Sequence, residues 1–167
     1  MNRHLLAAVA VAASVTLLAA CGGRAEEAAV GLPDDATVTY AFLDASVPPP
    51  YHRSVLLTVT REDAHIVVDS YGDILADERI ATPASVWETL GATLPAVEGL
   101  TTADPGQGCT GGTGIRLTVA TPTASLVDLD PQFCGGANDA VEEPIESWIA
   151  PARELFPPTD VLAPEGE

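Results

Sequence analysis

Two short runs of alternating apolar and polar residues lie between a pair of cysteines, and they restrict the fold of this 167-residue chain more than any other feature. The runs are Ile115 to Ala120 and Ser125 to Asp130, and Thr121-Pro122-Thr123-Ala124 joins them. Alternation with a period of two is typical of strands that bury one face, and a four-residue connection favours a hairpin. The sequence therefore predicts an antiparallel β-hairpin over residues 115–130.

The apolar pattern also predicts how the two strands of this hairpin pair. With Leu117 opposite Val127, the apolar side chains gather on one face, and Arg116 lies opposite Asp128 on the other face as an exposed ion pair. A slip of one residue would place an acid opposite Ile115 and turn every side chain to the wrong face. We expect the register that avoids this.

Cys109 and Cys134 flank the open end of the predicted hairpin. Glycine-rich flanks allow the two thiols to meet, and a disulfide there would stabilise the fold by about 3 kcal/mol in the loop-closure estimate. A metal pair and a redox-active pair are alternatives, although the segment has no Cys-x-x-Cys spacing and no histidine. The run Gly106 to Gly114 lacks the lysine and the following helix of a phosphate loop, so we interpret it as a loop that positions the disulfide.

The other predicted strands precede the hairpin. They are predicted from segments that alternate or carry β-branched residues. Residues 37–44 predict a single strand, and residues 54–60 and 65–69 predict a hairpin with its turn at 61–64. The weaker run 73–81 suits the edge of a sheet.

Two helices are predicted. Thr82 and Pro83 are typical of an N-cap and a first helical position, and Pro95 should end that helix. A second apolar stripe at helical spacing follows the hairpin; its helix starts near Asp139 or at Pro144, and Pro151 should kink or shorten it.

This order of elements predicts the fold class. We expect a single α+β domain over residues 36–157, an antiparallel β-sheet covered by two helices in the order ββ(β)-α-ββ-α, with one disulfide-stapled hairpin. Residues 158–167 are rich in proline and acids and are expected to form a disordered tail.

The net charge argues against several classes of partner. It is −17 for the chain and becomes −18 without residues 1–20, which contain Arg3 and no acid. Nucleic acid is disfavoured, because phosphate binding needs clustered basic residues. Lying flat on anionic lipid is disfavoured for the same reason.

The N-terminus has the pattern of an export signal. A short basic start precedes the apolar stretch Leu5 to Ala20, which is too short for a comfortable membrane span. Leu18-Ala19-Ala20-Cys21 follows the pattern of the bacterial lipobox, so the chain resembles a bacterial lipoprotein, and its all-arginine basic residues resemble actinobacterial usage.

That resemblance implies cleavage before Cys21, a diacylglyceryl group on its sulfur and a place on the extracytoplasmic face of the cell membrane, and it leaves open a fatty acyl chain such as palmitate on the new amine. Two acyl chains suffice for stable anchoring. A free or disulfide-bonded Cys21 after an ordinary signal peptide is the alternative. Residues 21–35 are expected to form a flexible tether. The mature region is also similar to small actinobacterial lipoproteins of unassigned role, through Cys109-Thr110-Gly111-Gly112 and Cys134-Gly135-Gly136.

Two groups of polar residues are candidate sites. Asp69, Asp73, Asp77 and Glu78 are acidic, but their spacing does not match a calcium loop, and they are interpreted as edge charges. His65, beside a turn, is interpreted as a surface residue. Tyr51, His52 and Arg53 follow three prolines in an exposed-looking loop that suits recognition of a partner.

No catalytic, cofactor or metal motif is present: the chain has neither a G-x-S-x-G elbow nor HExxH ligands. The sequence therefore favours a non-enzymatic binding or envelope-associated module with an extracytoplasmic protein partner. An inhibitor of exported proteases, acting through a loop over 48–53, is one alternative. A small hydrolase or ligand-sequestering domain is another, and a concave pocket with convergent polar groups would favour it.

Overall fold

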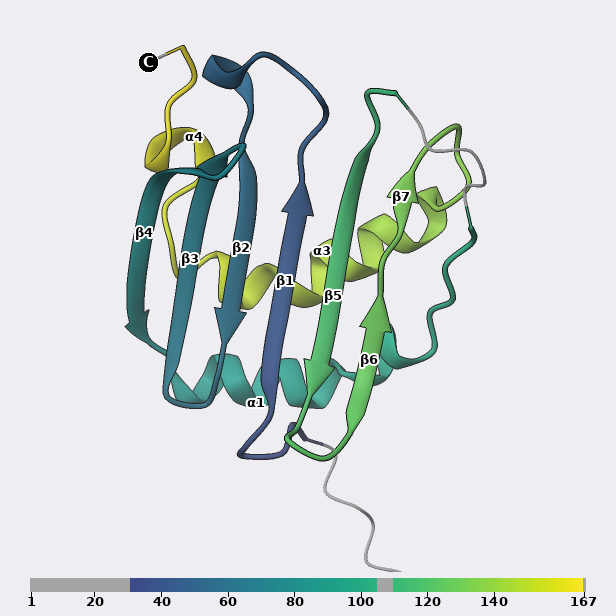
Figure 1. The fold of residues 1–167 in the computed structure, drawn as a ribbon. Helices are drawn as coiled ribbons and strands as arrows, with labels where there is room; N and C mark the ends of the chain where they lie inside the picture. Colours follow the sequence, from purple (N-terminus) through teal and green to yellow (C-terminus); the bar gives the residue numbers. More distant parts are fainter. Residues whose placement is uncertain (1–30, 105–109, 167) are drawn as a thin grey trace, which may run out of the picture.

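The structure is a computed structural model that describes residues 31–104 and 110–166. Seven strands in these residues form one antiparallel sheet: β1 (Thr37–Leu43), β2 (Ser54–Val59), β3 (Asp63–Ser70), β4 (Asp73–Ala81), β5 (Thr113–Ala120), β6 (Ser125–Leu129) and β7 (Gln132–Phe133). The strand order is β4-β3-β2-β1-β5-β6, and β7 pairs with the start of β5. The first strand of the chain therefore lies at the centre of the sheet (Figure 1).

The helices lie against one face of this sheet, behind it in Figure 1. They are α1 (Ala84–Thr93), α2 (Pro95–Glu98), α3 (Asp139–Arg153) and α4 (Thr159–Leu162), and a 3-10 turn, η1 (Pro49–Tyr51), lies between β1 and β2. The predicted α+β class with an antiparallel sheet is confirmed. The expected order omitted β7 and the short helices α2 and α4, which are too brief to leave a periodic signal.

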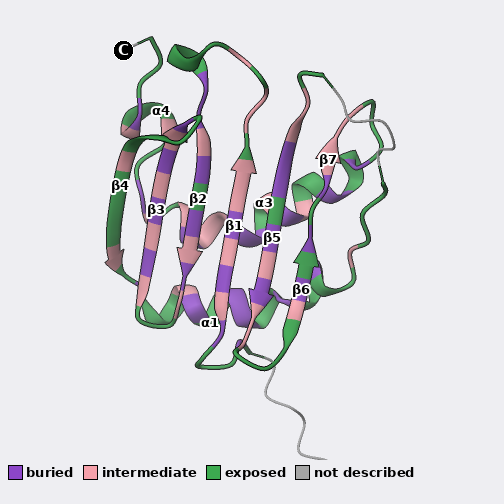
Figure 2. Cartoon of the chain, in the orientation of Figure 1, coloured by how far each residue is buried: buried purple, intermediate pink, exposed green. Residues whose placement is uncertain are grey.

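Strand alternation builds the core. In β3 every second residue is buried (Figure 2). β2 pairs with β3, β1 pairs with β2, and β5 pairs with β1, in registers that place the buried residues on one apolar face of the sheet. This face packs against Trp87 and Leu90 of α1 and against Ile145 and Ile149 of α3. Burying each such side chain contributes about 1.5 to 3 kcal/mol. The opposite face carries residues of intermediate exposure.

The two predicted hairpins are present. β2 and β3 form the first, and β4 lies at the edge of the sheet, as expected for the weaker run. β5 and β6 form the second, but its predicted register is wrong: Leu117 lies opposite Leu129, not Val127. A shift by two residues leaves every side chain on its face, so the apolar pattern does not distinguish the two registers. The turn decides, with Thr121 N–H donating to the Ala124 carbonyl and a bulge beside it.

The register change also corrects the cross-strand ion pair. Arg116 was expected to face Asp128, but its guanidinium lies 2.8 Å from the Asp130 carboxylate. Asp128 lies opposite Thr118 instead.

The start of α1 differs from expectation, whereas α3 has the earlier of its two predicted starts. Pro83 is the N-cap of α1 and no side chain caps the helix; Thr82 lies one residue too early, and its N–H donates to the Glu62 carbonyl. α3 starts at Asp139, so Pro144 does not open it and Pro151 does not end it. The buried stripe of α3 outweighs the hydrogen bonds that two prolines remove.

Both ends of the domain extend further than predicted. Leu32 is buried, so the expected tether is packed on the domain from residue 31 onward; residues 21–30 lie outside the described part. The predicted disordered tail is wrong for residues 158–166, which contain α4 and the buried Ala163. The reason is a set of hydrogen bonds to distant residues, described below.

Candidate functional site

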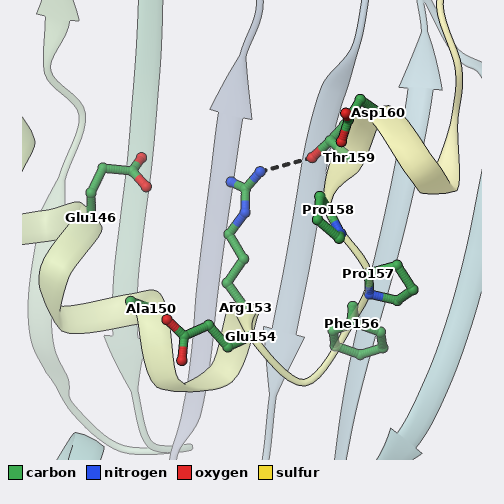
Figure 3. Close-up of a pocket in the computed structure, with 9 residues that line it drawn as sticks. All are labelled: Glu146, Ala150, Arg153, Glu154, Phe156, Pro157, Pro158, Thr159 and Asp160. Carbon is green, nitrogen blue, oxygen red and sulfur yellow. Dashed lines mark hydrogen bonds between the residues drawn. The ribbon is translucent and has the colours of Figure 1, made fainter.

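A groove lies between the second half of α3, the segment that follows it, and the upper end of the sheet. Its first cavity, of about 410 Å³, is shown in Figure 3 and is lined by Glu146, Ala150, Arg153, Glu154, Phe156, Pro157, Pro158, Thr159 and Asp160. An adjoining cavity of about 320 Å³ shares three of these residues and adds Phe42, Asp44, Arg53, Val55, Ala163 and Glu165. We call the two together the α3–α4 groove.

The sequence of α3 and its continuation explains the position of this groove. Glu146 and Arg153 are seven residues apart, about two turns, so they lie along the same side of the helix beside its buried stripe. The helix ends after Arg153, and buried Phe156 fixes the turn. Pro157 and Pro158 then carry the chain to α4, with Pro158 as its N-cap. Two walls are therefore built from adjacent chain segments.

Tyr40 connects the floor of the groove to the sheet. This residue of β1 is fully buried, and its hydroxyl donates a hydrogen bond to Glu146. Burial raises the pKa of Tyr40 well above its usual value, the bond to the Glu146 carboxylate raises it further, and the positive charge of Arg153 opposes the rise. Tyr40 therefore stays neutral and holds Glu146 in place.

Arg153 holds the far wall. Its guanidinium donates to the hydroxyl of Thr159, 2.8 Å away, at the first turn of α4 (Figure 3). This bond joins the end of α3 to the start of α4 across the mouth of the first cavity. Arg153 is thus a structural tie as well as a lining residue.

Arg53 fastens the C-terminal segment. It is 8% exposed, and its guanidinium donates to the carbonyls of Ala163, at 2.7 Å, and of Pro164. Gly166 N–H donates to the carbonyl of Pro50, at 2.8 Å. Residues 157–166 are therefore an ordered strap, and the wall of the second cavity depends on a residue far away in the chain.

The predicted recognition loop lies near this strap but is not exposed as expected. Tyr51 is 53% exposed, whereas His52 is buried and stacks on Tyr71 with ring centres 3.9 Å apart. The expectation of exposure is wrong for His52 and Arg53, because one packs under the β3–β4 turn and the other binds the strap. Only Tyr51 remains available as a contact residue from this triplet.

The acidic residues of β3 and β4 do not converge. Asp69 accepts a hydrogen bond from Gly72 N–H, and Asp77 lies 2.7 Å from the ring of His65. Among the described residues no cluster of three or more histidine, cysteine or acidic side chains is arranged to hold a metal ion. His65, expected at the surface, is partly exposed within β3.

The predicted cysteine sites fall largely outside the described residues. Cys134 is disulfide-bonded. Cys109, its predicted partner, lies in the undescribed segment 105–109, and the lipobox residues Leu18, Ala19, Ala20 and Cys21 lie before residue 31. The pairing and the lipidation therefore stay predictions. In the described residues no helix is long and apolar enough to cross a membrane.

The sequence interpretation missed the groove residues. Two signals for them were available in the sequence. Glu146 and Arg153 are charged residues beside the apolar stripe of α3, and Tyr40 has a hydroxyl at a core position of β1. Neither reveals that the strap closes over them. No protein family model matches the chain, and no curated protein matches its sequence.

The groove is suited to binding. Its described lining combines carboxylates, two guanidinium groups, the Thr159 hydroxyl and apolar side chains. Tyr40 is too deeply buried to contact a ligand directly.

Proposed function

We propose that the protein is a non-enzymatic binding module, held at the extracytoplasmic face of the cell membrane by lipid on Cys21, whose ligand occupies the α3–α4 groove. The observation that supports it is the groove itself: an open cavity of about 410 Å³ with apolar walls and polar groups that converge on it. Cavities of this size and mixed character are typical of ligand sites.

The groove favours one of the alternatives raised by the sequence over the others. A pocket with convergent polar groups was the feature expected of a ligand-sequestering domain, and we include that role in the proposal. For a hydrolase, the hydroxyl in the described lining, that of Thr159, is bonded to the guanidinium of Arg153 and not to a base. For a protease inhibitor, the 48–53 loop offers a single exposed large side chain, Tyr51, because Arg53 and His52 are buried.

The lipid anchor and the disulfide complete the proposal. The lipobox ending at Cys21 supports anchoring, and the nine residues between Cys21 and Gly31 allow the domain to stand off the surface. The disulfide-bonded state of Cys134 supports its pairing with Cys109 at the open end of the second hairpin. Both features suit an oxidising extracytoplasmic compartment.

A fragment screen tests ligand binding by the groove. Full-length protein in detergent micelles is screened by ligand-observed nuclear magnetic resonance against a library of small polar and apolar compounds. We expect hits that an Ala150→Trp substitution abolishes, because the indole fills the first cavity, and that Glu142→Trp, on the exposed side of the same helix, leaves unchanged. Hits that survive Ala150→Trp, or no hits, would refute the proposal.

A further inference from the structure

We infer that the α3–α4 groove binds a basic, partly apolar peptide segment in an extended form. The inference rests on the proposed function and adds the chemical class of the ligand. Charge, the state of the arginines, the apolar wall and the shape of the groove each support it.

The charge of the lining is strongly negative. The first cavity has the carboxylates Glu146, Glu154 and Asp160, and the second adds Asp44 and Glu165. The only basic residues in the two linings are Arg53 and Arg153, so five acids face two bases. A cationic ligand is favoured over an anionic one.

The two arginines offset part of this charge, and three acids remain in excess. The Arg53 guanidinium is buried and bound to carbonyls of the strap and to the His52 carbonyl, so it is committed to the fold. Arg153 donates to Thr159. Both arginines act as ties within the fold, and the lining stays acidic overall.

The acids divide into occupied and available ones. Glu146 accepts from Tyr40, and Asp44 accepts from two backbone N–H groups, those of Ala45 and Arg53. Glu154, Asp160 and Glu165 are exposed, and their carboxylates make no hydrogen bond or ion pair with another described residue. We assign Glu154 and Asp160 to ligand cations, because both line the first cavity.

Apolar atoms form the rest of the first cavity. Ala150, Phe156, Pro157 and Pro158 line it beside the two available acids, and the prolines fix the wall because their backbone has little freedom. A ligand that fills this space needs an apolar part next to its charge. Lysine and arginine with neighbouring aliphatic residues have that combination.

The shape favours a chain over a compact ligand. The two cavities share Arg153, Thr159 and Asp160 and lie on either side of these residues, so together they are longer than either cavity alone. An extended peptide segment can follow both. A second copy of this chain is a poor occupant, because each copy has a net charge of −17 and no lysine.

Three labelled pentapeptides test the inference by fluorescence anisotropy with full-length protein in detergent micelles. One alternates lysine and leucine, one glutamate and leucine, and one serine and leucine. We expect the lysine peptide to bind, its affinity to fall as salt rises from about 50 to about 500 mM, and the other two to bind more than about tenfold more weakly, since several ion pairs are lost.

A matched pair of double variants locates the binding. Glu154→Gln with Asp160→Asn should weaken the lysine peptide about three- to tenfold, because two exposed ion pairs are lost. Asp73→Asn with Glu78→Gln removes the same charge from the sheet edge and should change its affinity less than about twofold.

Three results would overturn the inference: equal binding of the serine or glutamate peptide, equal losses in both double variants, or no binding of the lysine peptide. If the lysine peptide fails while fragments still occupy the groove, the ligand class is wrong and the proposed function stands. If the fragments fail as well, both are wrong.

Discussion

The hydroxyl of Tyr40 donates to the carboxylate of Glu146 over 2.5 Å, and this bond joins the central strand of the sheet to the middle of α3. The two residues are 106 positions apart in the chain. This polar contact thus ties the floor of the groove to the core.

Tyr40→Phe tests this bond through its dependence on pH. Because the folded protein raises the pKa of Tyr40, only the unfolded chain releases this proton at first when the pH rises above about 10, so stability falls there. This tyrosine contributes a loss of up to about 1.4 kcal/mol per pH unit. Below that range its contribution is fully present. Between pH 8 and pH 11 the free energy of unfolding of the wild type, measured in urea, should fall more steeply than that of the phenylalanine variant. Identical slopes would contradict the assignment.

Arg53→Gln tests the strap. The substitution leaves two carbonyls of the strap without their donor and should destabilise the protein by about 1 to 3 kcal/mol. Hydrogen exchange should show the amides of Val161, Leu162 and Ala163 losing protection first. Arg61→Gln, which breaks an exposed pair with Asp34, is the control and should cost less than about 1 kcal/mol. A uniform loss of protection in all elements would argue against a separable strap.

Gly91→Ala tests where the ordered domain begins. An added Cβ would lie 2.6 Å from Leu32 N and 2.8 Å from Gly31 Cα, backbone atoms that cannot turn aside. We expect a loss of about 1 to 3 kcal/mol in thermal or urea unfolding. Gly99→Ala, where nothing lies within 4 Å of the new atom, should be close to neutral. If the two variants unfold alike, the segment at Gly31 does not pack on α1.

The cysteines separate anchoring from stability. Cys21→Ser should release the protein from membranes in cell fractionation while leaving its circular dichroism and unfolding midpoint unchanged, because Cys21 lies outside the packed domain. Cys134→Ser should leave the protein membrane-bound and lower its stability by about 3 kcal/mol, the loop-closure value for its predicted pairing with Cys109. A Cys21→Ser protein that stays in the membrane fraction without acylation would refute the lipoprotein interpretation.

The fold class followed from local patterns. Alternation in β3 and in the second hairpin, and the apolar stripe of α3, are properties of neighbouring residues, and each produced the expected element. The register of β5 and β6 escaped prediction because two registers bury the same residues. The sequence left two starts open for α3, because Pro144 suits a first helical position, and the structure has the earlier one, with Pro144 inside the helix.

The groove was not predictable from such patterns. Its walls meet only because Arg53, in the loop before β2, binds carbonyls of the strap, and because Tyr40 reaches Glu146. A proline-rich, acidic C-terminus has the composition of a disordered segment. Its own residues do not predict that an arginine far away in the chain will bind its carbonyls. The loop prediction found Arg53 but assigned it an exposed role, when its contacts are internal.

The central position of β1 has a consequence for how the chain folds. β1 hydrogen-bonds to β2, its neighbour in sequence, and to β5, which follows only after three further strands and the helices α1 and α2. A chain that emerges N-terminus first, from a ribosome or an export channel, cannot complete the sheet until β5 has appeared, and pairing across such a sequence separation is slow. Until then the apolar face of β1 to β4 is only partly covered. The chain therefore stays incompletely folded for most of its passage and reaches its final structure late.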